Sequence, residues 1–149
     1  MIKRTHLAIA GALALLLLPH VNYKIVFFPL VLICALIPDI DSPDSYFGHH
    51  KIFRPVQFLV QHRGIFHSFS LCLIISILFA LFVPILALSF FLGYGSHLIA
   101  DSFTLEGITP FWPWKRMSQG VLRTGGKTEW IVFACFIAVD AILFLRLFI

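Results

Sequence analysis

Charged residues are scarce in this sequence. Of its 149 residues, 11 are Lys or Arg and 7 are Asp or Glu, so 12% are charged, whereas 60% are hydrophobic and 17 are Phe. The mean hydropathy is +0.97. Soluble globular domains carry about a quarter of their residues as charges, so this scarcity excludes that class. It predicts a multispanning membrane protein, and the length predicts a single domain over residues 1–149.

Closely spaced cysteines and a leader-type cleavage site are also lacking. Cys34, Cys72 and Cys135 lie in separate apolar runs, which indicates core or lipid-facing side chains instead of disulfides or a zinc knuckle. Two positive charges precede the first apolar run, but no small-x-small cleavage site follows it, so we interpret the run as a retained span. The basic residues are scattered, which favours membrane topology and anionic lipids over nucleic acid as their explanation.

Five apolar runs predict an all-α, polytopic transmembrane helix bundle of about five spans. They cover residues 7–18, 25–37, 68–83, 85–100 and 130–149. The first two are short, because a bilayer core requires about 20 residues, and a very tight turn is expected at Pro84. Residues 46–60 mix aromatic, aliphatic and basic side chains around Pro55, which predicts an amphipathic segment in the membrane interface.

The positive charges predict the orientation of the bundle. With a cytoplasmic N-terminus, the far side of the membrane keeps only Lys24 and Arg146. The nine other basic residues then lie on the cytoplasmic side: Lys3, Arg4, Lys51, Arg54, Arg63, Lys115, Arg116, Arg123 and Lys127. The positive-inside rule therefore favours a multi-pass protein of the inner membrane with its N-terminus in the cytoplasm.

This topology brings ionisable side chains from separate spans to the cytoplasmic face. His97 and Asp101 share one helix face at the lip of the fourth run, because they are spaced i, i+4. Asp39 and Asp41 repel each other unless a cation lies between them. Ionisable groups at membrane depth are costly and usually face a partner or a watery cavity. The candidate metal ligands are His6, Asp39, Asp41, His62, His67, His97 and Asp101.

A set of imidazoles and carboxylates indicates zinc as the favoured ion, with manganese or ferrous iron as alternatives. Seven candidates exceed the needs of one tetrahedral ion, so one or two ions are expected. A purely structural network of polar side chains is the alternative. For two other residues we expect simpler roles. His20 is expected to be solvated on the opposite face, and Asp140 is expected to form a hydrogen bond across the bundle.

Several separated motifs resemble one known family. They are Thr5-His6, residues 36–43, Phe47-Gly48, residues 62–68, residues 93–101, Thr104, Gly107-Ile108 and residues 111–113. In this order they are similar to the bacterial inner-membrane-associated metal-dependent hydrolases, some of which are SOS-inducible and regulated by LexA. The resemblance runs from His6 to about Glu129. It implies metal ligands or catalytic groups at the seven candidates and at Glu129.

Two positions depart from that family's pattern. Phe66 stands where the family often has Thr, and Leu105 follows Thr104 where the family often has Pro. Neither departure removes a candidate ligand. The orientation of the substrate is the property that they could change.

The combined interpretation is a membrane-bound, metal-dependent hydrolase with its site at the cytoplasmic interface. The predicted catalytic residues are Glu129 or an aspartate such as Asp41 as general base, and Arg63 to stabilise negative charge. A site at headgroup depth among basic residues favours a lipid or small phosphoester as substrate and membrane lipids as partners. One alternative is an intramembrane metalloprotease or amidase, although no His-Glu-x-x-His motif is present. The other is a non-enzymatic metal-binding or transport protein.

Overall fold

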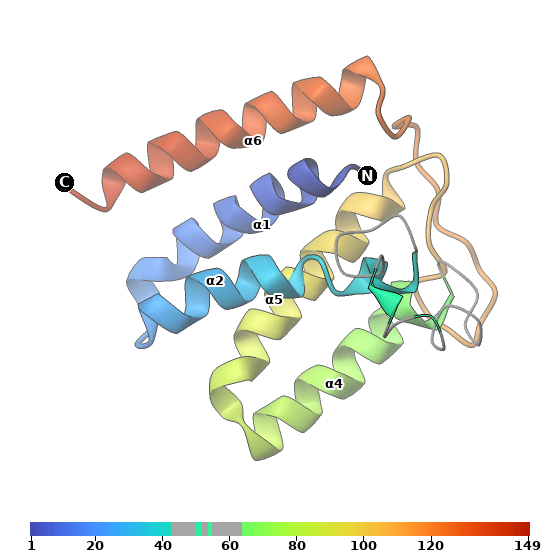
Figure 1. Ribbon diagram of the computed structural model, residues 1–149, viewed down its shortest axis with the longest axis horizontal. Helices are drawn as coiled ribbons and strands as arrows, with labels where there is room; N and C mark the ends of the chain where they lie inside the picture. The colour runs from blue at the N-terminus through green and yellow to red at the C-terminus, as the bar shows by residue number, and fades with distance from the viewer. Residues whose placement is uncertain (43–49, 52–53, 55–63) are drawn as a thin grey trace.

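The computed structural model describes residues 1–42, 50–51, 54 and 64–149 (Figure 1). This part of the chain contains five α-helices: α1 (Lys3–Leu17), α2 (Lys24–Cys34), α4 (Phe69–Phe82), α5 (Pro84–Ser102) and α6 (Lys127–Arg146). It also contains three short 3-10 helices: η1 (Leu18–His20), η2 (Pro38–Asp41) and η4 (Ile65–His67). These residues form no strand, only two isolated bridges within the loop 103–126. The all-α class is confirmed.

Proline and serine residues define several helix ends. Pro38 opens η2, and Pro84 takes the first position of α5, where its missing N–H costs nothing. The Ser68 hydroxyl caps α4 by accepting a hydrogen bond from the N–H of Leu71 at 3.3 Å. Only Val83 separates α4 from α5, so the tight turn predicted at Pro84 is confirmed.

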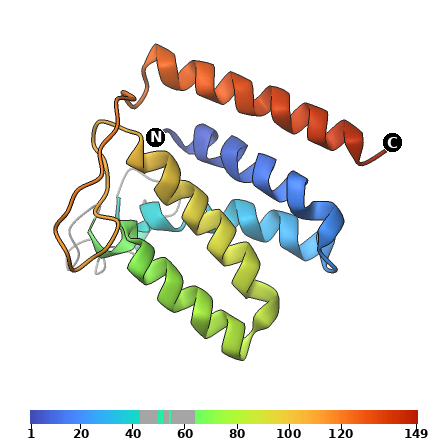
Figure 2. The same ribbon diagram turned by 180° about the vertical axis from the view of Figure 1, so that it is seen from behind.

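Helix α5 lies at the centre of the bundle. It packs against α1, α2 and α4, whereas α6 packs chiefly on α1 (Figures 1 and 2). Gly93 permits the close approach of α5 to α2, because a Cβ there would overlap the carbonyl oxygen of Val31. Two clusters of buried side chains fill the interfaces of α5 and α2: Cys34, Cys72, Phe90, Tyr94, Leu98 and Ile108, and Ala10, Ala14, Phe27, Val31 and Ala35.

The cysteines behave as their apolar surroundings predict. All three are free, and Cys34 and Cys72 are buried in the core between α2, α4 and α5. Cys135 is exposed on α6. They therefore serve as small apolar side chains, and none forms a disulfide.

Helix length separates the five helices into two groups. Of the described helices, α5 and α6 are long and apolar enough to cross a membrane, and α4 is a shorter apolar helix. With 15 and 11 residues, α1 and α2 extend about 22 and about 17 Å, less than the about 30 Å of a bilayer core. The count of about five spans therefore stays a prediction. The amphipathic segment predicted over residues 46–60 lies almost wholly outside the described residues.

The alternating direction of the helices gathers particular helix ends together. At one end of the bundle, α1, α4 and α6 begin, while α2 and α5 end (Figure 1). The short helices η2 and η4 and the loop 103–126 also lie at this end. The opposite end holds η1 and the turn at Val83. Every candidate ligand among the described residues belongs to the first end.

Candidate metal centre

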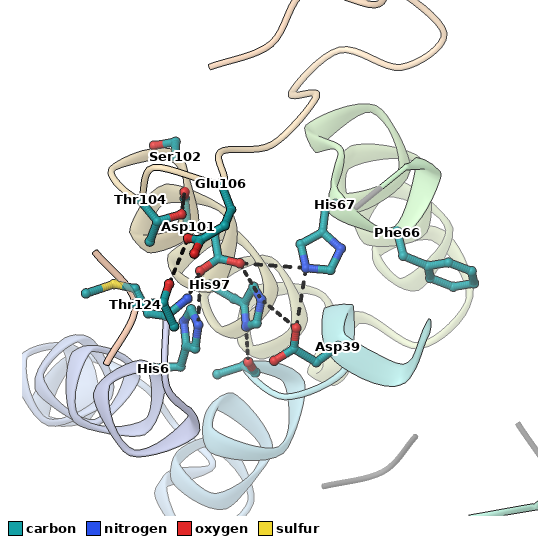
Figure 3. Close-up of polar contacts among 12 residues, drawn as sticks. His6, Asp39, Phe66, His67, His97, Asp101, Ser102, Thr104, Glu106 and Thr124 are labelled. Atoms are coloured by element: carbon teal, nitrogen blue, oxygen red, sulfur yellow. Dashed lines mark hydrogen bonds and ion pairs between the residues drawn. The ribbon is translucent and has the colours of Figure 1, made fainter. Parts of the chain in front are cut away.

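Four side chains from three elements meet at the end of the bundle where α5 ends (Figure 3). Asp39 comes from η2, His67 from η4, and His97 and Asp101 from the last turns of α5. Each offers one ligand atom, and these four atoms all lie within 4.8 Å of one another. The i, i+4 spacing on α5 directs His97 and Asp101 to one face, as the sequence predicts.

The distances between the donor atoms are those of a metal site. Nε2 of His67 lies 3.4 Å from Oδ1 of Asp39 and 3.8 Å from Oδ2 of Asp101. Nε2 of His97 lies 3.5 Å from the same Asp39 oxygen and 3.6 Å from the same Asp101 oxygen. Direct N–H···O bonds are typically about 2.9 Å long, whereas ligands about 2.1 Å from a tetrahedral ion are about 3.4 Å apart. The four residues therefore fit a divalent ion.

A backbone carbonyl orients the ring of His97. Its Nδ1 lies 2.8 Å from the carbonyl oxygen of Ala35. Because a carbonyl only accepts hydrogen bonds, Nδ1 carries the proton and Nε2 keeps its lone pair toward the cluster. Within the described part of the chain, this Nε2 has no hydrogen-bond partner. The close approach at Gly93, one turn earlier on α5, brings the Ala35 carbonyl within reach.

Two aspartates flank the ring of His67. Oδ1 of Asp39 lies 3.4 Å from Nε2, and Oδ2 of Asp41 lies 3.6 Å from Nδ1. Burial disfavours the charged imidazole, but the two neighbouring carboxylates outweigh it and raise the pKa of His67 to about 9. Burial also acts to raise the pKa of Asp39, yet the adjacent imidazole of His67 and those of His97 and His6 hold that pKa below its ordinary value. His67 must therefore lose a proton before its Nε2 can bind a metal.

The turn that carries His67 is anchored from two sides. The Tyr94 hydroxyl on α5 donates a hydrogen bond to the carbonyl of Phe66. The N–H of Phe69 donates to the carbonyl of Pro110 at 2.7 Å. The side chain of Phe66 points away from the cluster (Figure 3), so the departure from the family pattern at this position leaves the ligand atoms unaffected.

His6 on α1 extends the cluster on its other side. Its ring stacks on that of His97, with centroids 3.8 Å apart and planes 9° from parallel. Nε2 of His6 lies 3.3 Å from Oδ1 of Asp101. The α-amino group of Met1 contacts the same oxygen. Asp101 therefore directs one oxygen to His6 and the other to His67 and His97.

Known proteins match the chain over most of its length. The family described as YdjM inner membrane protein matches residues 1–148. The chain belongs to this family. YdjM of Escherichia coli (strain K12) and YdjM of Shigella flexneri, both inner membrane proteins, are each 34% identical over 122 residues, which cover 73% of this chain and 62% of the relative. The chain thus spans about three fifths of the length of these relatives, and no solved structure matches it.

Membership of the YdjM family agrees with the membrane setting predicted from composition. The name of the family refers to the inner membrane and to neither catalysis nor regulation. Hydrolysis and control by LexA therefore stay predictions.

The fold of this YdjM-family chain gathers six of the seven predicted ligands. Four of them form the cluster with tetrahedral spacing, Asp41 flanks His67, and His6 stacks on His97. His62, the seventh, and the predicted catalytic Arg63 lie outside the described residues. Their roles stay predictions.

Glu129, predicted as a general base, joins the start of α6 to the start of the chain. Oε1 accepts a hydrogen bond from the N–H of Ile2, and Oε2 accepts one from the N–H of Gly125, both at 2.6 Å. The residue is only 2% exposed. These contacts stabilise the backbone just before His6, and a role as a base stays a prediction.

Sequence reasoning missed the groups that orient the ligands. The carbonyl of Ala35 fixes the tautomer of His97, but a backbone carbonyl leaves no residue-type signal. The hydroxyl of Tyr94 could have been noticed, because a buried tyrosine in an apolar helix usually finds a hydrogen-bond partner. Gly93 next to it was a signal of close helix packing.

Proposed function

We propose that this chain is a multi-pass, membrane-embedded, metal-dependent hydrolase whose site faces the cytoplasmic headgroup region. Its proposed substrate is a lipid or a lipid-like phosphoester. One observation carries the proposal: four side chains from η2, η4 and α5 place two imidazole nitrogens and two carboxylates at the spacing of a tetrahedral metal site.

The chain's own residues supply ligands and their orientation. Asp39, His67, His97 and Asp101 would hold the ion, and this mixed set favours zinc, with manganese or iron as alternatives. When bound, the ion supplies Lewis acidity and lowers the pKa of a water molecule toward neutrality. The carbonyl of Ala35 holds His97 in the tautomer that keeps its lone pair toward the cluster.

The exposure of the ligands indicates how water and substrate approach. The side chain of Asp39 is 25% exposed, whereas those of His67, His97 and Asp101 are at most 2% exposed. Substrate therefore approaches from the Asp39 side of the cluster. Asp39 directs Oδ1 to both histidines, so its carboxylate lies where it can also take a proton from the attacking water.

The outer surfaces of the bundle support a membrane-embedded protein. Ile74 and Leu81 on α4 and Ile131 and Ile142 on α6 are 57–70% exposed. Exposed apolar side chains on this scale are costly in water and are covered by lipid chains in a bilayer. With five alternating spans and the N-terminus in the cytoplasm, the cluster would lie at the cytoplasmic face, where nine of the eleven basic residues would also lie.

The loop 103–126 supports a phosphate-bearing substrate at headgroup depth. It lies at the same end of the bundle as the cluster (Figure 1). Trp112 and Trp114 in this loop are 47% and 74% exposed, and the exposed Lys115 and Arg116 follow directly. Exposed tryptophans favour the membrane interface, and lysine and arginine attract anionic headgroups.

Metal analysis of the purified chain tests the metal centre. The wild type is expected to retain zinc or manganese after dialysis, whereas His67→Ala and Asp101→Ala lose it. His20→Ala is the matched control, because His20 is exposed at the opposite end of the bundle. Metal retained equally by all four proteins would contradict the site.

A substrate screen tests the reaction. The metal-loaded wild type is expected to hydrolyse a phospholipid in mixed micelles faster than a soluble aryl phosphate, and to leave a peptide intact. His67→Ala should abolish this activity and His20→Ala should preserve it. Cleavage of the peptide alone would favour the protease alternative, and metal binding without any hydrolysis would favour the non-enzymatic one.

A further inference from the structure

The two oxygens of Asp101 face different imidazoles. Oδ2 lies 3.6 Å from Nε2 of His97 and 3.8 Å from Nε2 of His67, inside the four-residue cluster. Oδ1 lies 3.3 Å from Nε2 of His6, which is not one of those four residues. A carboxylate that presents each oxygen to a separate nitrogen ligand has the geometry of a bridge between two ions.

The spacing of His6 and His97 matches that of ions in two-metal sites. Their rings are nearly parallel, with centroids 3.8 Å apart and planes at 9°. Two ions in hydrolytic two-metal sites lie about 3.5–4 Å apart. Parallel imidazoles at this separation, each with Nε2 toward a different oxygen of Asp101, would therefore direct their lone pairs to two adjacent ions.

The burial of His6 is a second and independent observation. Its side chain is completely buried. Among the described residues, neither of its ring nitrogens has a hydrogen-bond partner. Burying an imidazole without such partners costs free energy, and a metal ligand bond at Nε2 would offset that cost.

A simple ion pair between His6 and Asp101 explains these contacts less well. A protonated His6 would place its positive charge against the face of His97 and close to the α-amino group of Met1, which contacts the same oxygen. The distance of 3.3 Å from Nε2 to Oδ1 is also longer than a typical charge-assisted hydrogen bond of about 2.8 Å. It is close to the ligand separation of about 3.4 Å around a tetrahedral ion.

We propose that the site holds two divalent ions bridged by Asp101. Asp39, His67, His97 and Oδ2 of Asp101 bind the first ion, and His6 with Oδ1 of Asp101 binds the second. This inference rests on the proposed metal centre and deepens it. An ion at Oδ1 replaces the contact of that oxygen with the α-amino group of Met1.

The two positions differ in their ligands. The first has four protein ligands, whereas the second has one imidazole and one shared carboxylate oxygen among the described residues. On the described residues alone, the second ion is therefore bound more weakly and keeps more coordination positions for further ligands. Such a pair of ions suits phosphoester oxygens, which two-metal sites bind on both the attacking and the leaving side.

Manganese titration with electron paramagnetic resonance tests the bridge on the full chain in detergent micelles. The wild type is expected to bind two manganese ions per chain in two affinity classes and to give an exchange-coupled spectrum when both are bound. His6→Gln is expected to bind one manganese ion and to give the six-line spectrum of an isolated ion. The matched control His20→Gln should behave as the wild type does.

The outcomes separate this inference from the proposed metal centre. One manganese ion per wild-type chain without exchange coupling would overturn the second ion and leave the first in place. Two coupled ions in His6→Gln would overturn the role of His6. No manganese or zinc bound by the wild type would overturn both proposals. Because the wild-type spectrum alone decides the number of ions, the test does not depend on the folding of any variant.

Discussion

Helices α5 and α6 are alike in length and apolar character, and they differ in their surroundings. They have 19 and 20 residues, and both are long and apolar enough to cross a membrane. Within an apolar stretch of 18 residues in each helix, 56% of the stretch in α5 is buried in the protein, against 6% of that in α6. Hydrophobicity therefore identifies both helices, but only packing distinguishes the helix that carries the site.

The two helices also hold their acidic residues differently. Asp101 on α5 lies among His6, His67 and His97. Asp140 on α6 faces Gly11 of α1, and its Oδ1 has no hydrogen-bond partner among the described residues. The hydrogen bond that the sequence predicts across the bundle is therefore not found at this oxygen. An acidic residue in an apolar helix thus indicates a site only when other helices supply partners.

Removing Asp101 is expected to have the largest effect. Asp101→Ala deletes a ligand whose two oxygens face three imidazoles, so metal affinity should fall by more than the about 10–100-fold that loss of an outer-shell partner causes. Asp140→Ala on α6 should leave metal affinity unchanged. Equilibrium dialysis with metal analysis measures both. Equal losses would remove the distinction between α5 and α6.

Glycine substitutions compare the packing of α5 with that of α6. Gly93→Ala forces a Cβ against the backbone of Val31 and should lower the free energy of unfolding by about 1–3 kcal/mol. Gly11→Ala places its Cβ 3.3 Å from the Asp140 carboxylate, a side chain that can shift. Its effect should lie within about 1 kcal/mol, because helix propensity favours alanine. Unfolding in detergent micelles measures both, and the reverse ranking would contradict the central position of α5.

Metal binding next to α5 should depend on pH through His67. Its pKa is raised to about 9, so an ion must displace its proton below that pH, and affinity should rise about tenfold per pH unit toward pH 9 and then level off. Asp39 has a lowered pKa and stays ionised throughout. Calorimetry in buffers of different ionisation enthalpy should detect the released proton.

The raised pKa of His67 also affects the free energy of unfolding of the metal-free protein. The pKa of His67 in the folded protein lies above the unfolded value of about 6.5. The stabilisation by protonated His67 is therefore fully present below pH 6.5 and is lost as pH rises to about 9. A metal affinity that is flat between pH 6.5 and 9 would show that metal binding displaces no proton from His67 in this range, and it would contradict the raised pKa.

The contact between α1 and α6 near the cluster should have the smallest effect. The guanidinium of Arg4 lies 3.3 Å from the centroid of the half-exposed Trp130 ring. Such a cation–π contact contributes about 0.5–1 kcal/mol at exposed sites. A double-mutant cycle of Arg4→Gln and Trp130→Leu should give a coupling of this size, with Arg146→Gln as a control. A coupling near zero would mean that this cation–π contact does not help to hold α6 on α1.

Local features of the sequence, such as apolar runs and prolines, predicted the described helices and the turn before α5. Apolar runs located all five helices, and Pro84 predicted the turn before α5 because proline suits the first helical position. The end of α2 was predicted too far along the chain. The run 25–37 continues apolar beyond Cys34, where α2 ends, because Ala35 to Ile37 are apolar but lie in the turn before η2.

The sequence alone determined which ionisable residues come to one end of the bundle. Alternation of helix direction carries the end of α2, the start of α4 and the end of α5 to the same place whatever the details of packing. The i, i+4 spacing likewise places His97 and Asp101 on one face before any tertiary contact forms.

Only the tertiary structure decided which of these residues can share an ion. The rotation of each helix about its axis sets whether donor atoms lie close enough to share one ion. Helices that are apolar on nearly every face carry little periodic signal for that rotation. Asp39 and Asp41, two residues apart, therefore looked equivalent in sequence. In the fold they flank opposite nitrogens of His67, so Asp39 directs an oxygen into the four-residue cluster, whereas Asp41 orients the ring.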